Sequence, residues 1–281
     1  MSLLDRIRAC QNDDCDAYLP FCVAGVTIGR IKGEFVPSIA RFNDVFEIDD
    51  TSVVLRTILR TYKERTQAMA GVLGELRLEG LIPGWRDEPY SAGTAFNTPP
   101  LFEMERAAIP LFGIQGYGVH MNGWLNKDGR THMWIARRSL TKPTGPGKLD
   151  QMVGGGQPVG VSLRDNLIKE CGEEAGIPSA LAETAKPVGM VSYTTVRPEG
   201  LRNDILFNFD LYVPEDFKPV NQDGEVAEFM LWDIDKVMQR LSDTEDFKFN
   251  SALVIIDFLI RHGFIEADDP DYPDIVRGLH Q

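Results

Sequence analysis

The alternation of apolar and polar positions divides the chain into two parts. In the first part, Phe21–Val36 and Val45–Leu55 combine apolar residues with glycine and aspartate turns, which predicts short strands. Leu55–Leu78 instead repeats its apolar residues every three to four positions, which predicts a helix. These elements, within the first hundred or so residues, indicate a small α+β module.

From Leu111 onward the pattern changes to longer strands. Tyr117–Leu125 and His132–Arg138 alternate, and the turn residues between them predict a hairpin. Two further strands and two helices are expected at Pro187–Val196, Ile205–Val213, Ile234–Leu241 and Phe247–His262. Periodicity alone supports an α/β or α+β fold, with a loosely packed acidic end after residue 265.

A helix predicted near the middle of the chain carries three glutamates on one face. Glu170, Glu173 and Glu174 have the spacing i, i+3, i+4, so their side chains project from a single arc. Ser162 is a suitable N-cap, and Gly176 is a suitable C-terminal stop. The apolar positions fall on a separate arc that can face a core: Leu163, Leu167, Ile168, Cys171 and Ala175.

Three adjacent carboxylates are the oxygen donors that magnesium and manganese prefer. A solvated acidic face is the alternative, because such faces are common on surface helices. Gly154, Gly155 and Gly156, just before this helix, allow a backbone to approach a charged ligand closely. The combination favours a site for a divalent cation.

The stretch Gly155–Ile177 resembles the Nudix box, G-x5-E-x7-R-E-U-x-E-E-x-G-U, in which U is a bulky aliphatic residue. Its first glycine, its closing glutamates and its final Gly-Ile pair occur at the family spacing. Three positions depart from the pattern: Val161 replaces the early glutamate, Lys169 the arginine and Cys171 the first U. A lysine keeps the positive charge but lacks the bidentate fork of arginine.

The resemblance implies an α/β/α sandwich with a mixed sheet for the second part of the chain. It also implies that Glu170, Glu173 and Glu174 hold Mg2+ or Mn2+, which promotes attack of water on a diphosphate linkage. Glu173 is a candidate general base as well as a ligand. Glu225, after the box, is the second candidate base, whereas a solvated strand edge is favoured for Glu228.

The leading part resembles the segment that precedes the catalytic part in a Nudix subgroup related to thiamine pyrophosphokinase. The shared residues are LPF at 19–21, WRDE at 85–88 and ERAAIPLFGI at 105–114. This resemblance implies an N-terminal α+β domain over residues 1–110, a Nudix hydrolase domain over 111–265 and an acidic tail over 266–281. It points to thiamine diphosphate, or damaged forms of it, as the small-molecule substrate.

The segment Arg137–Gly156, here called the basic loop, precedes the acidic helix in a protein that is otherwise acidic. Cations in this loop can meet the outer oxygens of a diphosphate, although a solvated basic loop is the alternative. The segment Thr194–Asn203 is expected to be a loop whose two arginines help to shape the pocket. The predicted substrate-binding residues are therefore Arg137, Arg138, Lys142, Lys148, Gly155, Gly156, Arg197 and Arg202.

Composition and charge limit the partners. With 281 residues, 43% of them apolar, the chain can form two modest domains with real cores. A net charge of −13 argues against a general binder of nucleic acid or anionic membranes, but not against phosphorylated small molecules that bind with metal. No apolar run approaches the length that spans a membrane. The oligomeric state is left open, with a homodimer among the alternatives.

The N-terminus and the cysteines bear on the compartment. The first residues are too charged for a secretory signal, and a cytoplasmic location is expected by default. The four cysteines match no strong zinc pattern and are expected to be reduced thiols: Cys10, Cys15, Cys22 and Cys171.

Two other functions remain open. The departures at Val161 and Lys169 are compatible with a diphosphate-binding or regulatory protein that has little turnover. The basic-loop pattern also occurs near isopentenyl diphosphate isomerase, but such an enzyme should offer a catalytic cysteine. After Arg138 none fits, because Cys171 faces the predicted core. A kinase is disfavoured because no G-x4-G-K-[ST] loop is present.

Overall fold

The C-terminal part of the chain is built around a mixed sheet of seven strands. The computed structural model describes residues 2–12 and 17–280. The strand order is β11-β12-β7-β8-β13, with β10 paired to β7 and β9 paired to β8. The strands are β7 (Gln115–Lys127), β8 (Arg130–Arg138), β9 (Leu149–Asp150), β10 (Val153–Gly156), β11 (Lys186–Arg197), β12 (Gly200–Tyr212) and β13 (Val226–Asp233).

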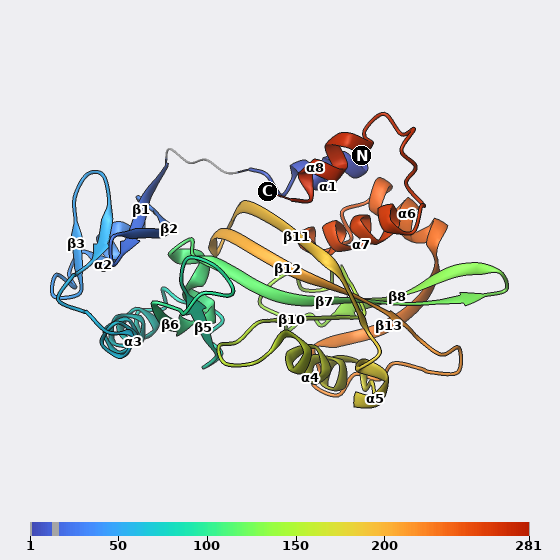
Figure 1. Ribbon diagram of the computed structural model, residues 1–281, viewed down its shortest axis with the longest axis horizontal. Helices are drawn as coiled ribbons and strands as arrows, with labels where there is room; N and C mark the ends of the chain where they lie inside the picture. Colours follow the sequence, from blue (N-terminus) through green and yellow to red (C-terminus); the bar gives the residue numbers. More distant parts are fainter. Residues whose placement is uncertain (1, 13–16, 281) are drawn as a thin grey trace.

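Helices cover both faces of this sheet, as expected for an α/β/α sandwich (Figure 1). One face carries α4 (Leu163–Ala175) and α5 (Ser179–Ala182), and the other carries α6 (Ile234–Asp243) and α7 (Phe249–Arg261). The pair β12–β7 is parallel, whereas the other pairings in the sheet are antiparallel. The mixed sheet predicted for this part is therefore confirmed.

The N-terminal module has its own core. A four-stranded sheet in the order β2-β1-β4-β3 packs with the long helix α3, and the separate pair β5–β6 lies against that helix. Its elements are β1 (Tyr18–Val23), β2 (Val26–Lys32), α2 (Val36–Ile39), β3 (Phe46–Ile48), β4 (Val53–Leu55), α3 (Tyr62–Leu78), β5 (Pro89–Ala92), β6 (Phe102–Glu105) and the 3-10 helix η2 (Arg106–Leu111). The predicted α+β character is confirmed.

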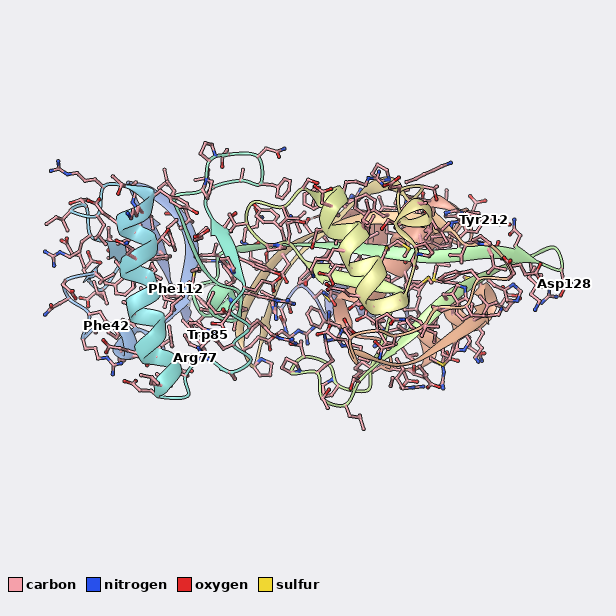
Figure 2. All side chains as sticks on the ribbon, turned by 90° about the horizontal axis from the view of Figure 1, so that it is seen from below. Phe42, Arg77, Trp85, Phe112, Asp128 and Tyr212 are labelled. Atoms are coloured by element: carbon pink, nitrogen blue, oxygen red, sulfur yellow. The ribbon has the colours of Figure 1, made fainter. Side chains whose placement is uncertain are left out.

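The helix α3 begins later than the apolar spacing suggests. Thr61 caps it: its hydroxyl accepts from the Glu64 N–H, and the Glu64 carboxylate accepts from the Thr61 N–H. This capping box fixes the start at Tyr62, because it satisfies backbone donors that the first turn leaves free. Figure 2 shows Arg77 and Trp85 in this module, at the opposite end of the molecule from Asp128 on the β7–β8 hairpin.

Both chain ends pack on the C-terminal part of the molecule. The helices α1 (Leu3–Arg8) and α8 (Tyr272–Gly278) lie together over the face that carries α7 (Figure 1). Ile7, Ile275 and Leu279 are buried in the core that these helices share with the sheet. The acidic segment at 266–274, where a loosely packed end was expected, is exposed or half-buried, and the chain packs again only from Ile275 onward.

The segment Thr194–Asn203 is also not the loop that was expected. β11 and β12 continue through it and pair down to Arg197 and Gly200, which leaves a tight turn at residues 198–199. None of the described helices is both long and apolar enough to cross a bilayer. Cys10 and Cys171 are buried free thiols and Cys22 is partly exposed, while Cys15 lies outside the described residues.

Candidate active site

The acidic helix α4 lies against the glycine strand β10. Ser162 caps the helix through the N–H of Asp165, and Gly176 ends it in the left-handed conformation (φ 63°). Leu167, Cys171 and Ala175 are buried against the sheet, as the spacing predicted. This packing turns the opposite arc, with its glutamates, toward the edge of β10.

Two of the three glutamates are held against that strand. The Gly154 N–H donates a hydrogen bond of 2.8 Å to Glu174, whose side chain is only 6% exposed. A Cβ atom at Gly155 would collide with the Glu170 carboxyl group. A residue with a side chain would not fit at position 155, because the Glu170 carboxylate occupies the space that its Cβ atom would need.

Burial disfavours the charged form of both carboxyls. Burial raises the pKa of Glu174 to about 8, and the charge of Glu170 adds to this, while the Gly154 N–H opposes it. Burial also raises the pKa of Glu170, an effect that the nearby charges of Lys169 and Arg106 counteract. Two neighbouring carboxyls with raised pKa values form a site that a cation would stabilise.

Glu173 lies further from the strand. Its side chain is 48% exposed and pairs with Lys169 at 2.7 Å, and the same lysine reaches Glu170 at 3.2 Å. Within residues 2–12 and 17–280, no set of three or more His, Cys, Asp or Glu side chains is arranged to hold a metal ion. The helix thus brings together Glu170 and Glu174, while Glu173 is turned toward Lys169.

The donor set nevertheless fits a divalent cation at two of the three predicted ligands. Glu170 and Glu174 offer hard oxygen donors, one turn apart on one helix face, and burial penalises their negative charge. The ammonium of Lys169, a half-exposed side chain, lies 3.2 Å from the Glu170 carboxylate. A bound ion would compensate this charge more completely than one partly exposed lysine can.

A cleft of about 210 Å³ opens beside the glycine strand. Gly154, Gly155 and Gly156 form part of its wall, while the glutamates of α4 are not in its lining. The cleft lies between the N-terminal module and the seven-stranded sheet, and both contribute cations to it. Its basic side chains are Arg86, Arg106, Arg138, Lys142, Arg202 and Lys248.

Five of the predicted substrate-binding residues line this cleft, and three do not. Arg138, Lys142, Gly155, Gly156 and Arg202 are in the lining. Outside it, Arg137 pairs with Glu228 at 2.6 Å, Lys148 donates to the Glu245 carbonyl at 2.5 Å, and Arg197 lies over the Phe249 ring at 3.9 Å.

Arg138 forms a buried ion pair with Asp150 at 2.8 Å. Its guanidinium also donates to the carbonyls of Thr144 and Gly145, so it shapes the basic loop from inside. Neighbouring charges hold the pKa of the Asp150 carboxyl well below its usual range despite its burial, with Lys248 contributing most and Arg138 next. This arginine therefore organises the cleft wall as well as lining it.

Lys248 was not predicted from the sequence. It lies just before α7, far along the chain from the basic loop, yet it lines the same cleft. Burial lowers the pKa of its ammonium to about 8, against the attraction of Asp150. Within the described residues this ammonium makes no hydrogen bond or close ion pair, so it is available to an anion in the cleft.

The N-terminal module supplies the other unpredicted groups. Glu105 is buried, and its carboxylate accepts from the backbone N–H groups of Arg86 and Glu88 at 3.0 and 3.2 Å. These bonds fix the WRDE loop, while Glu88 in turn pairs with Arg106 at 2.8 Å. The motif itself was visible in the sequence, but its contact with the C-terminal part of the chain was not.

Glu225 and His120 occupy different positions in the site. The Glu225 carboxylate forms an ion pair with Lys142 and lies 3.4 Å from Arg86, and both cations lower its pKa despite partial burial. His120 lines the cleft but is buried, and its Nδ1 contacts the Gln151 amide oxygen at 2.8 Å. Burial lowers the pKa of His120 to about 4, so the ring is neutral near pH 7.

Comparison with known proteins identifies both parts of the chain. A family model described as "NUDIX domain" matches residues 118–253, and one described as "Domain of unknown function (DUF4743)" matches residues 2–116. Nudix hydrolase 20, chloroplastic, from Arabidopsis thaliana is 43% identical over 286 residues, which cover 98% of this chain and 76% of that protein. Nudix hydrolase 24, chloroplastic, from the same plant is 42% identical over 280 residues, with coverages of 98% and 77%.

The names of these relatives contradict one prediction. Both plant proteins are named chloroplastic, so the expectation of a cytoplasmic location is wrong. The charged N-terminus argues only against a secretory signal and does not decide among other compartments.

The structural comparison is weaker. The NUDIX domain of Shewanella oneidensis NrtR complexed with ADP ribose aligns with a TM-score of 0.41 and 13% identity, covering 53% of this chain and 90% of that one. Values this low carry no argument about ligands. The sequence identity over almost the full chain is what assigns the family: this protein belongs to the Nudix hydrolases, enzymes that hydrolyse diphosphate linkages.

Proposed function

We propose that the protein hydrolyses the diphosphate of a small organic diphosphate in a reaction that depends on Mg2+ or Mn2+. The observation that carries this proposal is the pair Glu170 and Glu174, held against the same glycine strand that lines a cationic cleft. Water attacks a phosphorus atom, the bridging P–O bond breaks, and the products are an organic monophosphate and inorganic phosphate. A metal ion on these carboxylates would supply charge neutralisation and a more acidic bound water.

The residues of the cleft bind and orient the substrate. Lys142, Arg202 and Lys248 face the cleft and can contact phosphate oxygens, and Arg106 extends this cationic wall toward Glu170. Because these four cations come from four separate segments, a diphosphate placed among them is held in one orientation.

Two glutamates are candidates for accepting the proton of the attacking water. Glu173 is on the same helix face as the proposed ligands, while Glu225 lies between Lys142 and Arg86. Two cations make Glu225 a weaker base, since they stabilise its ionised form. We therefore assign the base to Glu173 and give Glu225 the role of positioning Lys142 and Arg86.

Thiamine diphosphate, or a damaged form of it, is the substrate we favour. This rests on the resemblance of the N-terminal module to the subgroup related to thiamine pyrophosphokinase. The test is phosphate release by the purified protein with Mg2+ or Mn2+ against thiamine, nucleoside and sugar diphosphates. Faster hydrolysis of thiamine diphosphate than of the other diphosphates supports this substrate. If thiamine diphosphate is hydrolysed no faster than the others, or not at all, the substrate assignment is wrong.

A diphosphate-binding protein without turnover is the second candidate. The observation that favours it is Lys169, which replaces the family arginine and contacts both Glu170 and Glu173. This ammonium competes with a metal for the same carboxylates. Binding of a diphosphate without phosphate release at any metal concentration would support this second function.

A further inference from the structure

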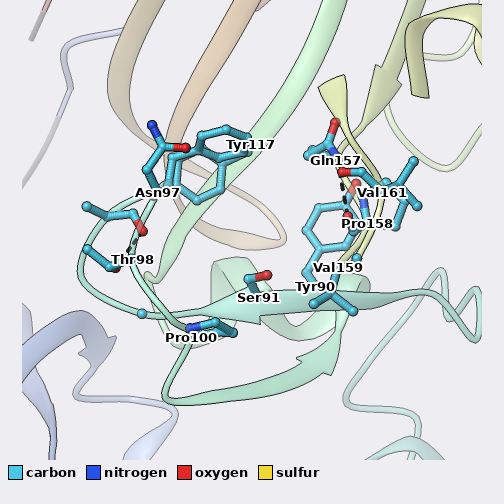
Figure 3. Close-up of a pocket in the computed structure, with 14 residues that line it drawn as sticks. Tyr90, Ser91, Asn97, Thr98, Pro100, Tyr117, Gln157, Pro158, Val159 and Val161 are labelled. Atoms are coloured by element: carbon cyan, nitrogen blue, oxygen red, sulfur yellow. Dashed lines mark hydrogen bonds between the residues drawn. The ribbon is translucent and has the colours of Figure 1, made fainter. Parts of the chain in front are cut away.

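A second hollow of about 190 Å³ lies beside the cationic cleft (Figure 3). One wall comes from the N-terminal module, where the strand β5 leads into the loop at 93–101. The opposite wall is the segment Gln157–Val161, which connects β10 to the acidic helix. Figure 3 shows Asn97, Thr98 and Tyr117 on one side and Gln157, Pro158 and Val161 on the other.

The walls of this hollow are held together. The Val159 N–H donates to the Pro89 carbonyl at 3.0 Å, which joins the two domains at its floor. The Gln157 amide donates to the Val161 carbonyl at 2.6 Å and closes the connecting segment on itself. The hollow is therefore a formed compartment rather than a gap between mobile loops.

Its chemistry differs from that of the cleft. Within the described part of the chain, its lining contains no acidic or basic side chain, whereas six basic side chains line the cleft. The Phe96 ring packs against Tyr117 at 5.0 Å between centroids and against Phe207 at 4.8 Å. An uncharged wall with an aromatic cluster suits a planar ring, which can stack or meet these rings edge to face.

Two tyrosines connect the compartments. Tyr90 and Tyr117 line both the hollow and the cleft, so a ligand can extend from one to the other past them. The Tyr90 hydroxyl is buried and makes no hydrogen bond within the described residues. A buried hydroxyl without a partner is costly, so the junction of the two compartments keeps an unsatisfied polar atom within the described residues.

Val161 gives the departure from the Nudix box a physical meaning. This position, where the family has a glutamate, lies in the wall of the uncharged hollow and is 38% exposed. A carboxylate there would place a negative charge in a hollow whose lining offers no cation to pair with it. Valine instead keeps the compartment neutral.

We propose that this compartment binds the organic group of the diphosphate, and that the group it selects is a planar, uncharged aromatic ring. The proposal rests on the proposed function, since it places the two phosphates in the adjoining cationic cleft. Phe96 and Val161 are then residues that determine specificity, and the N-terminal module forms half of the substrate site.

The test is isothermal titration calorimetry in EDTA, which measures binding without turnover. The probes are ADP and GDP, which carry an uncharged aromatic ring, and isopentenyl diphosphate and inorganic pyrophosphate, which carry none. We expect Phe96→Ala and Val161→Glu each to weaken binding of the two ring-bearing probes about tenfold. In both variants the dissociation constant of inorganic pyrophosphate should stay within about threefold of the wild-type value, because this probe lies in the cationic cleft and not in the compartment.

Matched controls test whether the position matters. Val26→Glu makes the same change at a site of similar exposure (41%) in the N-terminal module, and Ile58→Ala removes another exposed apolar side chain. Both should bind every probe as the wild type does. Thermal unfolding of each variant separates a loss of binding from a loss of folding, and the two test variants change opposite walls.

The outcomes distinguish the two proposals. If the variants weaken pyrophosphate as much as the ring-bearing probes, or if the wild type binds isopentenyl diphosphate as tightly as them, the compartment does not select an aromatic ring. If binding depends on the ring but no diphosphate is hydrolysed, the proposed reaction is wrong, whereas the proposed role of the compartment in binding the ring is supported.

Discussion

The backbone N–H of Gly154 points at the carboxylate of Glu174, at 2.8 Å, across the interface between a strand and a helix. This bond links the glycine run to the acidic face in one structural unit. The remaining lone pairs of that buried carboxylate have no other hydrogen-bond donor within the described residues. The arrangement leaves oxygen atoms available to a cation, and it leads to the following predictions.

Glu174→Gln should abolish most of the activity and leave the fold intact. The amide oxygen can still accept from Gly154, but the charge that would hold a metal is lost. We expect kcat to fall by a factor on the order of 100 or more. Phosphate release measures this, with Glu47→Gln, on an exposed strand position, as the control. Full activity of Glu174→Gln would rule out the proposed metal site.

Gly155→Ala should be damaging although it adds a single methyl group. The new Cβ would meet the Glu170 carboxyl group and push it off the strand. We expect a loss of activity of about tenfold or more. Gly74→Ala, in the helix α3 with open space around it, is the matched control and should stabilise the protein by about 0.5–1 kcal/mol. Equal activity of the two variants would contradict the packing argument.

Arg138→Met should destabilise the protein more than it alters substrate affinity. Arg138 is 9% exposed, and its removal leaves Asp150 in the interior with Lys248 as its remaining strong cation. We expect a loss of about 3–5 kcal/mol in the free energy of unfolding, measured by urea denaturation. Arg137→Met breaks an exposed pair with Glu228 and a 3.3 Å hydrogen bond to the Gly147 carbonyl, and should cost about 1 kcal/mol. Similar losses would show that Arg138 is not structural.

Lys248 should make activity depend on pH. Its pKa is lowered to about 8, so in the free protein the ammonium loses its proton as the pH rises past that value. Phosphate binding needs the charged form, so kcat/KM of the wild type should fall above pH 8. Lys248→Met should be about tenfold less active at pH 7 and nearly equal to the wild type at pH 9.5. Lys63→Met, an exposed lysine on α3, should follow the wild type at every pH.

The two candidate bases can be separated by comparing Glu173→Gln with Glu225→Gln. If Glu173 accepts the proton, its variant should lose about 100-fold in kcat. Glu225→Gln should instead change mainly KM, because it frees Lys142 and Arg86 from their shared carboxylate. A large loss of kcat in Glu225→Gln alone would reverse the assignment.

The sequence by itself determined the elements with strong local periodicity. The helix with Glu170 and Glu174 on one arc, its caps and the β7–β8 hairpin follow from spacings of two and of three to four residues, which the backbone geometry fixes. The Nudix box could be found because its residues are contiguous in the chain. The apolar side chains of the acidic tail were also visible, but the surface that buries them was not.

Only the tertiary structure decided which distant residues share the site. Arg106, Lys142 and Lys248 meet in one cleft because the N-terminal module docks on the sheet and the start of α7 lies beside β9. In the sequence, Val161 was only a departure from the Nudix box. The structure places it in the wall of the uncharged hollow. The physical reason is that neighbours along the chain are fixed by backbone geometry, whereas neighbours across the cleft depend on strand order and domain packing, which no local spacing encodes.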